Sequence, residues 1–436
     1  MGFEEGNEKH IAASCVIDSF HDFIGNRNLD FESVGSEDSP IPAFPRALVQ
    51  DLLVDAEKVL SQLPNVVNLE GGIYVVGDLH GNIRDLLRIL ATAEPPPVSR
   101  FLFLGDYVDR GEYSVEVIIL LLAMVVIYPN YITLLRGNHE YEVVNSTYGF
   151  KEQVYALYGN TGLYESFNQT FSYMPVAALI DDTTFCVHGG LSPKLKRIDQ
   201  LNDFDRTLTP PCELMNDIVW SDPSNVTESC IQSTRGNGCL FGHTFLHNFL
   251  VNNKLKRLVR AHECVKNGVR VGKDSKIVTV FSTCNYKGEG SNQCGIIKVI
   301  EDGSFQAFNL KLIKVLRRVN ANFSKIAYRG KSTSIVLGSL PSATNLLSTL
   351  RLIARGGIVG SRSMIRKKTI GNLRNLNSSC LIVKPDLPDE STKRRWTLGA
   401  NSLSDILAAS EASNISTSCS LCAYETPLSS SFIIPQ

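Results

Sequence analysis

Four short apolar stretches recur along the first half of the chain, and each runs directly into glycine and a cluster of polar residues. They lie at residues 73–76, 101–104, 132–135 and 184–187, before GDLHG, GDYVDRG, RGNHE and HGG. Because segments of helical length separate them, at 83–93 and 114–128, they predict buried strands of an α/β sheet. Open α/β sheets place their functional sites beyond the carboxyl ends of strands, so we expect the polar clusters to carry the chemistry.

Other apolar patterns extend this prediction to two layers of sheet. A stripe at helical spacing predicts an amphipathic helix over residues 47–63. The longest apolar run, residues 117–127, is too short to span a bilayer and predicts a buried helix. Three late runs at 276–282, 294–300 and 305–310 lack helix-length connections and predict a second, antiparallel sheet. The expected fold class is α/β, a β-sandwich flanked by helices.

The chain divides by composition into three segments. Two prolines at 40–42 end an N-terminal extension, residues 1–41, and the strand and helix patterns then define an α/β domain at 42–310, which holds all the polar clusters and is the expected catalytic domain. From 311 to 436 periodicity is lost, which predicts a largely disordered tail. This tail holds 18 Lys and Arg against 6 Asp and Glu, whereas the rest of the chain holds 25 against 38. Such a tail could bind the catalytic domain or an acidic, calmodulin-like partner, although a solvated charge run has the same composition.

The cysteine content and the N-terminal sequence indicate the cellular location of the protein. Eleven cysteines, an odd number scattered along the chain, predict reduced thiols and an intracellular protein, cytoplasmic or nuclear. The acidic N-terminus lacks an apolar leader, and Gly6 stands where a myristoylation motif needs Ser or Thr. Cys419 and Cys422 have CxxC spacing, but without a second pair nearby two free thiols are favoured over a zinc knuckle. We expect neither membrane nor nucleic acid as a partner.

Six oxygen and nitrogen donors stand in or near the polar clusters. They are Asp78, His80, Asp106, Asn138, His188 and His262. This mixture of carboxylate, amide and imidazole suits Mn, Fe or Zn better than Ca. Two metal ions about 3.5–4 Å apart need a bridging carboxylate, for which Asp106 in the middle cluster is the candidate. One such residue alone is more often a turn residue or a solvated polar group, but together they favour a dinuclear site at the strand ends.

Two arginines and a histidine complete the set of groups that phosphoryl chemistry requires. Arg110 and Arg235 are candidate clamps because a guanidinium can hold two phosphate oxygens. Arg110 lies inside a polar cluster, whereas Arg235 lies in STRGNG, where an arginine without a role is also common. His139 directly follows Asn138 and is the candidate general acid, with Asp109 orienting its ring.

Eight motifs in order resemble the phosphoprotein phosphatase family, which includes the type 1 and type 2A enzymes and calcineurin. They are GDLHG, GDYVDRG, RGNHE, HGG, WSDP, RG, RAH and NYKGE. The resemblance covers about residues 42–310 and implies the calcineurin-like metallophosphoesterase fold. It also implies a serine/threonine protein phosphatase in which a metal-bridging hydroxide attacks phosphorus directly and His139 is the general acid.

The resemblance implies a role for each matching residue. One metal ion would be held by Asp78, His80 and Asp106, and the other by Asp106, Asn138, His188 and His262. The phosphate would contact Arg110, Asn138, His139 and Arg235, with His139 and Asp109 as the acid pair. Tyr286 would overhang the site from a mobile loop, and Trp220 and Tyr148 would line a substrate groove.

The chain departs from the family pattern around these residues. Thr283 and Cys284 replace the Ala and Pro of SAPNY, Lys287 stands where cysteine is common, and Tyr141 follows GNHE in place of cysteine. Because the predicted ligands are intact, the departures bear on substrate preference and inhibitor sensitivity. A cation at Lys287 would favour acidic residues near the phosphate, although a solvent-facing lysine is an equal alternative.

Two other functions remain open from the sequence. A nucleotide or dinucleoside-polyphosphate phosphoesterase shares the first three motifs, whereas HGG, WSDP and the NY loop favour a protein phosphatase. A phosphatase-like scaffold usually lacks a ligand or the acid, and this chain has both. The expected cofactors are two divalent metal ions, Mn with Fe or Zn as alternatives, and the expected partners are phosphoproteins and a regulatory subunit.

Overall fold

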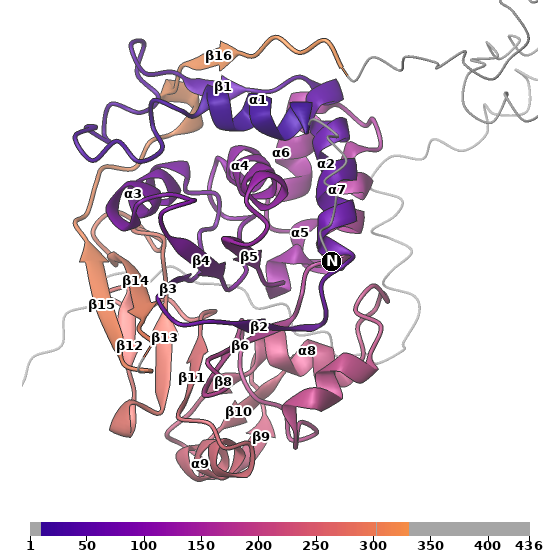
Figure 1. The fold of residues 1–436 in the computed structure, drawn as a ribbon, viewed down its shortest axis with the longest axis vertical. Helices are drawn as coiled ribbons and strands as arrows, with labels where there is room; N and C mark the ends of the chain where they lie inside the picture. Colours follow the sequence, from indigo (N-terminus) through magenta and orange to yellow (C-terminus); the bar gives the residue numbers. More distant parts are fainter. Residues whose placement is uncertain (1–9, 302, 331–436) are drawn as a thin grey trace, which may run out of the picture. The chain divides into compact units, whose positions relative to one another are not determined.

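Two β-sheets form the centre of the structure, a computed structural model that describes residues 10–301 and 303–330. The first sheet has five strands (Figure 1). In spatial order they are β15 (Phe305–Leu310), β14 (Cys294–Val299), β3 (Ile73–Val76), β4 (Arg100–Phe103) and β5 (Ile132–Leu134). Strands β3, β4 and β5 run parallel, and β14 pairs antiparallel with β3. The predicted buried strands of an α/β sheet are therefore confirmed for the first three motifs, and they pair in parallel.

The second sheet has six strands and mixed directions. In order they are β12 (Val269–Val271), β13 (Ile277–Val280), β11 (Arg257–Arg260), β7 (Thr184–Val187), β6 (Ala177–Ile180) and β2 (Val66–Leu69). Strands β7, β11 and β13 run parallel to one another, so the residues that follow β7 and β11 emerge at the same edge. A smaller sheet of β8 (Asp222–Pro223), β10 (Cys239–Phe241) and β9 (Cys230–Gln232) lies beside it.

A buried apolar layer joins the two large sheets into a sandwich. It includes Val75 and Leu102 from the first sheet and Cys186, Val259 and Val280 from the second. Helices cover the outer faces (Figure 1): α1 (Ile11–Ser19), α2 (Arg46–Leu60), α3 (Ile83–Ala93), α4 (Ser114–Ile127), α6 (Phe150–Tyr158) and α7 (Leu163–Ser172) on the first sheet, α8 (Glu213–Trp220) and α9 (His243–Asn252) on the second. The predicted sandwich flanked by helices is confirmed.

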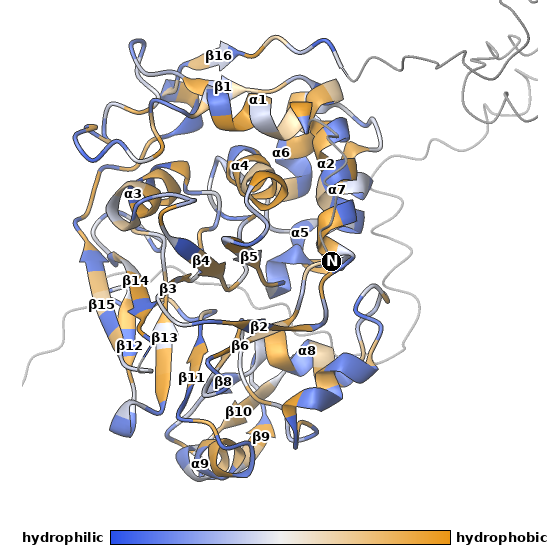
Figure 2. Cartoon of the chain, viewed as in Figure 1, coloured by the Kyte–Doolittle hydropathy of each residue, from blue (hydrophilic) through white to orange (hydrophobic). Residues whose placement is uncertain are grey.

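Helix α4 is the centre of the larger core. Nearly all of its residues are apolar (Figure 2), and they are buried around the whole circumference, as expected for a helix that other helices cover. The helix predicted at 47–63 is α2, which buries Leu48, Leu52 and Ala56. In the part of the chain described here, every helix is too short or too polar to cross a membrane.

The late strands differ from the expectation of a separate antiparallel sheet. Strands β14 and β15 extend the first sheet, and β13 enters the second one between β11 and β12. The reason is that β14 pairs with β3, whereas β13 pairs with β11. Strands β13 and β14, which are consecutive in the sequence, therefore belong to different sheets. Strand β7 likewise belongs to the second sheet rather than beside β5.

The packed body also extends beyond residues 42–310 at both ends. Helix α1 buries Ala12, Ala13 and Val16 in the main core, and β1 (Ile41–Ala43) pairs with β16 (Phe323–Lys325). Residues 311–330 are thus not part of a disordered tail, because hydrogen bonds and ion pairs hold them against the body. The rest of the predicted tail, including Cys419 and Cys422, lies outside the described residues.

Candidate active site

The strand ends of both sheets converge on one point. Asp78 and His80 follow β3, Asp106 follows β4 and Asn138 follows β5, while His188 and His262 follow β7 and β11 of the other sheet. Three of these residues adopt positive φ angles that L-residues rarely take: His80 at 41°, Asp106 at 57° and His262 at 64°. Such backbone conformations persist where the surroundings impose them, and they cluster at functional sites.

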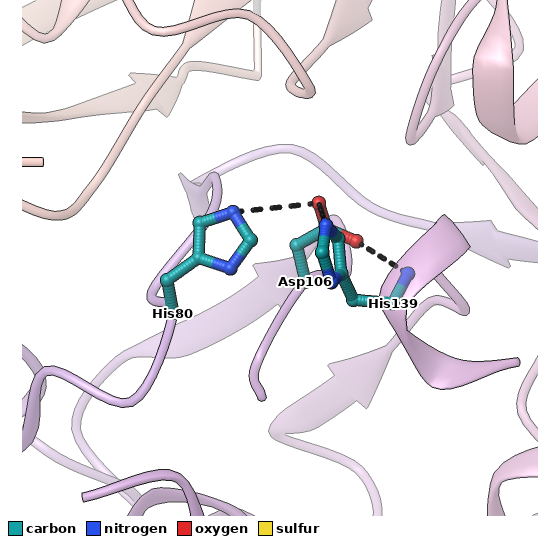
Figure 3. A group of neighbouring side chains, drawn as sticks. All are labelled: His80, Asp106 and His139. Carbon is teal, nitrogen blue, oxygen red and sulfur yellow. Dashed lines mark hydrogen bonds and ion pairs between the residues drawn. The ribbon is translucent and has the colours of Figure 1, made fainter. Parts of the chain in front are cut away.

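Asp106 lies between two groups of donors. Its Oδ2 is 3.6 Å from His80 Nε2, and its Oδ1 accepts a hydrogen bond of 3.0 Å from the His139 amide (Figure 3). The same Oδ2 is 3.3 Å from His188 Nε2. Two groups of three side chains could each hold a metal ion, and both contain Asp106: one with His80 and His139, the other with His188 and His262. A single carboxylate in both groups is the arrangement expected of a bridging ligand.

The rings of His80 and His188 direct the lone pair of Nε2 toward Asp106. Nδ1 of His80 lies 3.0 Å from the Val108 carbonyl, and Nδ1 of His188 lies 3.0 Å from the Leu104 carbonyl. Each Nδ1 can only donate there, so in a neutral ring Nε2 is left as an acceptor. Metal-ligating histidines are held in the same way by the second ring nitrogen.

The acceptors then crowd against one another. His188 Nε2 is 2.9 Å from Asn138 Oδ1 and 3.2 Å from His262 Nδ1. Burial and the charge of Asp106 raise the pKa of Asp78 to about 7, and burial lowers the pKa of His80 to about 3. Asp106 and His188 shift the opposite way, because their mutual attraction outweighs burial, lowers the pKa of Asp106 and raises that of His188. Buried carboxylate, amide and imidazole acceptors this close together need cations between them, so these residues fit a pair of divalent metal ions.

His139 differs from the other rings because its Nδ1 faces a carboxylate. The atom lies 2.6 Å from Asp109 Oδ2, and Asp109 Oδ1 accepts a hydrogen bond from the Phe150 amide. Burial acts to lower the pKa of His139, but the charge of Asp106 and the hydrogen bond to Asp109 outweigh burial and raise it. Proximity alone would admit His139 as a metal ligand, but a ring that retains its proton suits an acid.

The two arginines stand at the exposed mouth of the site. The Arg110 guanidinium lies 4.0 Å from the centre of the Tyr148 ring and lines a cavity with His80 and Tyr286. Arg235 donates from Nε to Asp222 Oδ2 at 2.6 Å, and its charge helps to lower the pKa of His262, after burial and the charges of two other residues. The structure thus brings both predicted clamps beside the metal-ligand cluster.

Three aromatic rings surround the same cluster. The Tyr286 ring stacks on His80 at 5.0 Å, and Tyr148 lies 5.5 Å from His139. The Trp220 ring meets His262 edge-on at 5.5 Å. The three residues expected to overhang or line the site therefore lie beside it.

Sequence reasoning missed supporting residues inside the motifs. Glu140 is fully buried and accepts hydrogen bonds from the amides of Asp106, Tyr107 and Gly137, which fixes the turn that carries Asp106. Gly137 can have no side chain, because its Cβ would lie 2.3 Å from Asp106 Oδ1. The sequence feature that could have identified Glu140 is its position as the last residue of the RGNHE motif.

Two further supporting residues form a chain of charges behind Arg235. Arg260 is fully buried and donates to Asp222 Oδ1 at 2.7 Å, while the second oxygen of Asp222 holds Arg235. Arg260 also donates to the main-chain oxygens of Gly189 and Ser221. Asp222 is the acidic residue of WSDP and Arg260 begins RAH, so both motifs marked these positions without indicating the role.

Comparison with known proteins places the chain in one family. The model of the calcineurin-like phosphoesterases matches residues 72–266. A protein phosphatase 2A catalytic subunit of Dictyostelium discoideum is 40% identical over 259 residues, which cover 59% of this chain and 83% of the relative. The serine/threonine-protein phosphatase 6 catalytic subunit of Caenorhabditis elegans is 37% identical over 281 residues, covering 64% and 84%. The chain belongs to the serine/threonine protein phosphatases of the calcineurin-like phosphoesterase family.

A solved structure agrees with this assignment. A Saccharomyces cerevisiae protein serine/threonine phosphatase with similarity to human phosphatase PP5 matches with a TM-score of 0.59 and 29% identity, over 66% of this chain and 97% of the other. The predicted family, fold and enzyme class are therefore confirmed for this phosphatase. The ligand, clamp and acid roles of individual residues stay predictions that the geometry supports.

Proposed function

We propose that this phosphatase hydrolyses phosphoserine and phosphothreonine in proteins, at a site where six side chains hold two divalent metal ions. The observation that carries this proposal is the position of Asp106 between His80 on one side and His188 with His262 on the other, directly beside the pair of His139 and Asp109. When bound, the metal ions supply Lewis-acid activation of water and neutralise charge on the phosphate. The oxygen and nitrogen donors favour Mn, with Fe or Zn as alternatives.

The remaining residues bind the phosphate and move one proton. Arg110 and Arg235 bind its oxygens, because a guanidinium at the mouth of the site can offer two parallel donors. His139 holds a proton on Nε2, which lies 4.0 Å from Asp106 Oδ2 and thus faces the cluster. As water attacks phosphorus and the bond from phosphorus to the serine or threonine oxygen breaks, that proton passes to the departing oxygen. Asp109 keeps the ring oriented and stabilises its positive charge.

A comparison of substrate classes tests the proposal. The full chain, with manganese added, is assayed on a phosphoserine peptide and on a dinucleoside polyphosphate. We expect the peptide to have the higher kcat/KM by a wide margin, since the relatives at 40% and 37% identity are protein phosphatases. A higher kcat/KM for the dinucleotide would assign the enzyme to nucleotide hydrolysis instead.

Location and partners extend the proposal. All cysteines among the described residues are free thiols, which supports an intracellular location, cytoplasmic or nuclear. A regulatory subunit or a calmodulin-like partner would bind through the basic residues 331–436. The test compares phosphopeptide turnover by the full chain and by a version ending at residue 330. An inhibitory tail predicts a rise on truncation that shrinks with salt, whereas equal turnover at low salt would contradict it.

A further inference from the structure

A cavity of about 560 Å³ opens beside the phosphate site. His80, Arg110 and Tyr286 line its inner side, so it is continuous with the place where the substrate phosphate binds. The opposite wall consists of residues 313–317, which follow the last strand of the first sheet. Residues that flank the phosphorylated residue of a bound peptide are therefore within reach of this cavity.

Hydrogen bonds to main-chain atoms fix the wall in place. Asn285 Nδ2 donates to the Ile313 carbonyl at 2.7 Å, and Arg84 Nη1 donates to the Lys314 carbonyl at 3.2 Å. From the other side, the Lys314 amide donates to Glu32 Oε1 at 3.1 Å. Because these contacts use the backbone, the Lys314 side chain can be changed without releasing the wall.

An ion pair anchors the end of the same segment. Arg318 donates to both carboxylate oxygens of Glu116, at 3.0 and 2.7 Å, and Glu116 is only 3% exposed. Arg317 is paired with Glu112 at 2.9 Å, so the charges of these two lining residues compensate each other. The wall is held at both ends.

The charges that remain in the cavity are mostly positive. Arg84 directs its guanidinium to main-chain oxygens, two of them at Val34 and Lys314. Lys314 is exposed, and within residues 10–301 and 303–330 no ion pair engages its ammonium group. Arg110 adds a third cation, and Glu289 opposes them as the lining acid that has no paired cation in the described part of the chain.

We propose that this cavity is a subsite for an acidic side chain next to the phosphorylated residue, with Lys314 as the specificity-determining residue. The inference rests on the proposed function, because it requires a phosphoprotein at the metal site. An exposed lysine attracts a carboxylate weakly in water, by about 0.2–1 kcal/mol, which corresponds to a preference of about 1.4- to 5-fold. That range is small enough to tune substrate choice without determining catalysis.

The test measures a ratio of kcat/KM within matched peptides. Each phosphoserine peptide is made with glutamate or glutamine on the N-terminal side of the phosphoserine, and a second pair carries the change on the C-terminal side. For one of the two pairs, we expect the glutamate to glutamine ratio to fall about 1.4- to 5-fold in Lys314→Ala and further in Lys314→Glu. Glu289→Gln should raise the same ratio, because it removes the opposing charge.

Lys325→Ala is the matched control, since Lys325 is an exposed lysine outside the cavity. Its ratio should equal that of the unchanged protein, and all differences should shrink with added salt. Equal ratios in both Lys314 variants, for both peptide pairs, would overturn the subsite. Failure of the unchanged protein to hydrolyse the glutamine peptides would instead contradict the proposed function.

Discussion

Nδ1 of His139 lies 2.6 Å from Oδ2 of Asp109, and both side chains are buried. This contact directs Nε2 of the ring toward the metal-ligand cluster and stabilises the protonated ring. The other rings that point Nε2 at Asp106, those of His80 and His188, place Nδ1 against main-chain carbonyls. The carboxylate partner distinguishes the predicted acid from the predicted ligands.

The loss of turnover in His139→Gln should depend on how much the leaving group of the substrate needs a proton. A serine alkoxide leaves poorly without a proton, so the phosphoserine peptide should lose about 10²–10⁴-fold in turnover. A nitrophenolate needs little protonation, so nitrophenyl phosphate should lose much less. The measurement is turnover on both substrates with metal content determined in parallel, and the content should be unchanged. Equal losses on both substrates, or lost metal, would make His139 a ligand or a phosphate-positioning group.

Asp109→Asn should show the same selectivity in milder form. The ring remains, but it loses the carboxylate that orients it and favours its proton, at a cost of about 10–100-fold on the phosphoserine peptide. The amide introduced by this substitution keeps an oxygen for the Phe150 N–H, so the fold should be retained, as circular dichroism would show. A loss as large on nitrophenyl phosphate as on the peptide would refute the orienting role.

Asp106→Asn should lose metal as well as activity. One oxygen of this residue faces both donor groups, so removal of its charge weakens both coordination spheres. Metal analysis of the purified variant should therefore show both ions depleted. Asp199→Asn is the control, since Asp199 is largely exposed and pairs with Arg197 rather than with any predicted ligand. Two retained metal ions with normal turnover would show that Asp106 does not bridge.

Arg318→Ala should destabilise the fold more than Arg317→Ala. Loss of Arg318 leaves the buried Glu116 carboxylate without its two donors, which costs about 1–3 kcal/mol. Arg317 pairs with a more exposed Glu112, and such a pair contributes about 0–1 kcal/mol. Urea unfolding of the two variants gives the comparison. Equal stability would mean that the segment after residue 310 does not support the body.

Local patterns predicted the elements, whereas pairing between distant segments did not follow from them. The runs at 73–76 and 184–187 match β3 and β7, because a short apolar run bounded by glycine is a strand signal in itself. The sheet to which each strand belongs depends on partners far along the chain, as β14 with β3, and no local period encodes that choice. The predicted start of the tail at residue 311 was wrong for a similar reason. Arg318 forms an ion pair with Glu116, which lies 202 residues earlier in the sequence.

The same distinction applies to the site. The ligand and clamp residues could be predicted because nearly all of them follow a strand within a polar motif. Asp222 and Arg260 could not be assigned roles, because their function is to hold Arg235 through contacts that only the folded chain creates.

The most direct measurement is phosphate release from a phosphoserine peptide by the full chain, before and after removal of metal with a chelator. We predict that the treated protein loses its activity and regains it when manganese is added, while the treated Asp106→Asn variant regains little. Turnover that survives complete removal of metal would contradict a metal-dependent phosphatase, and so would the absence of turnover from the unchanged protein with manganese bound.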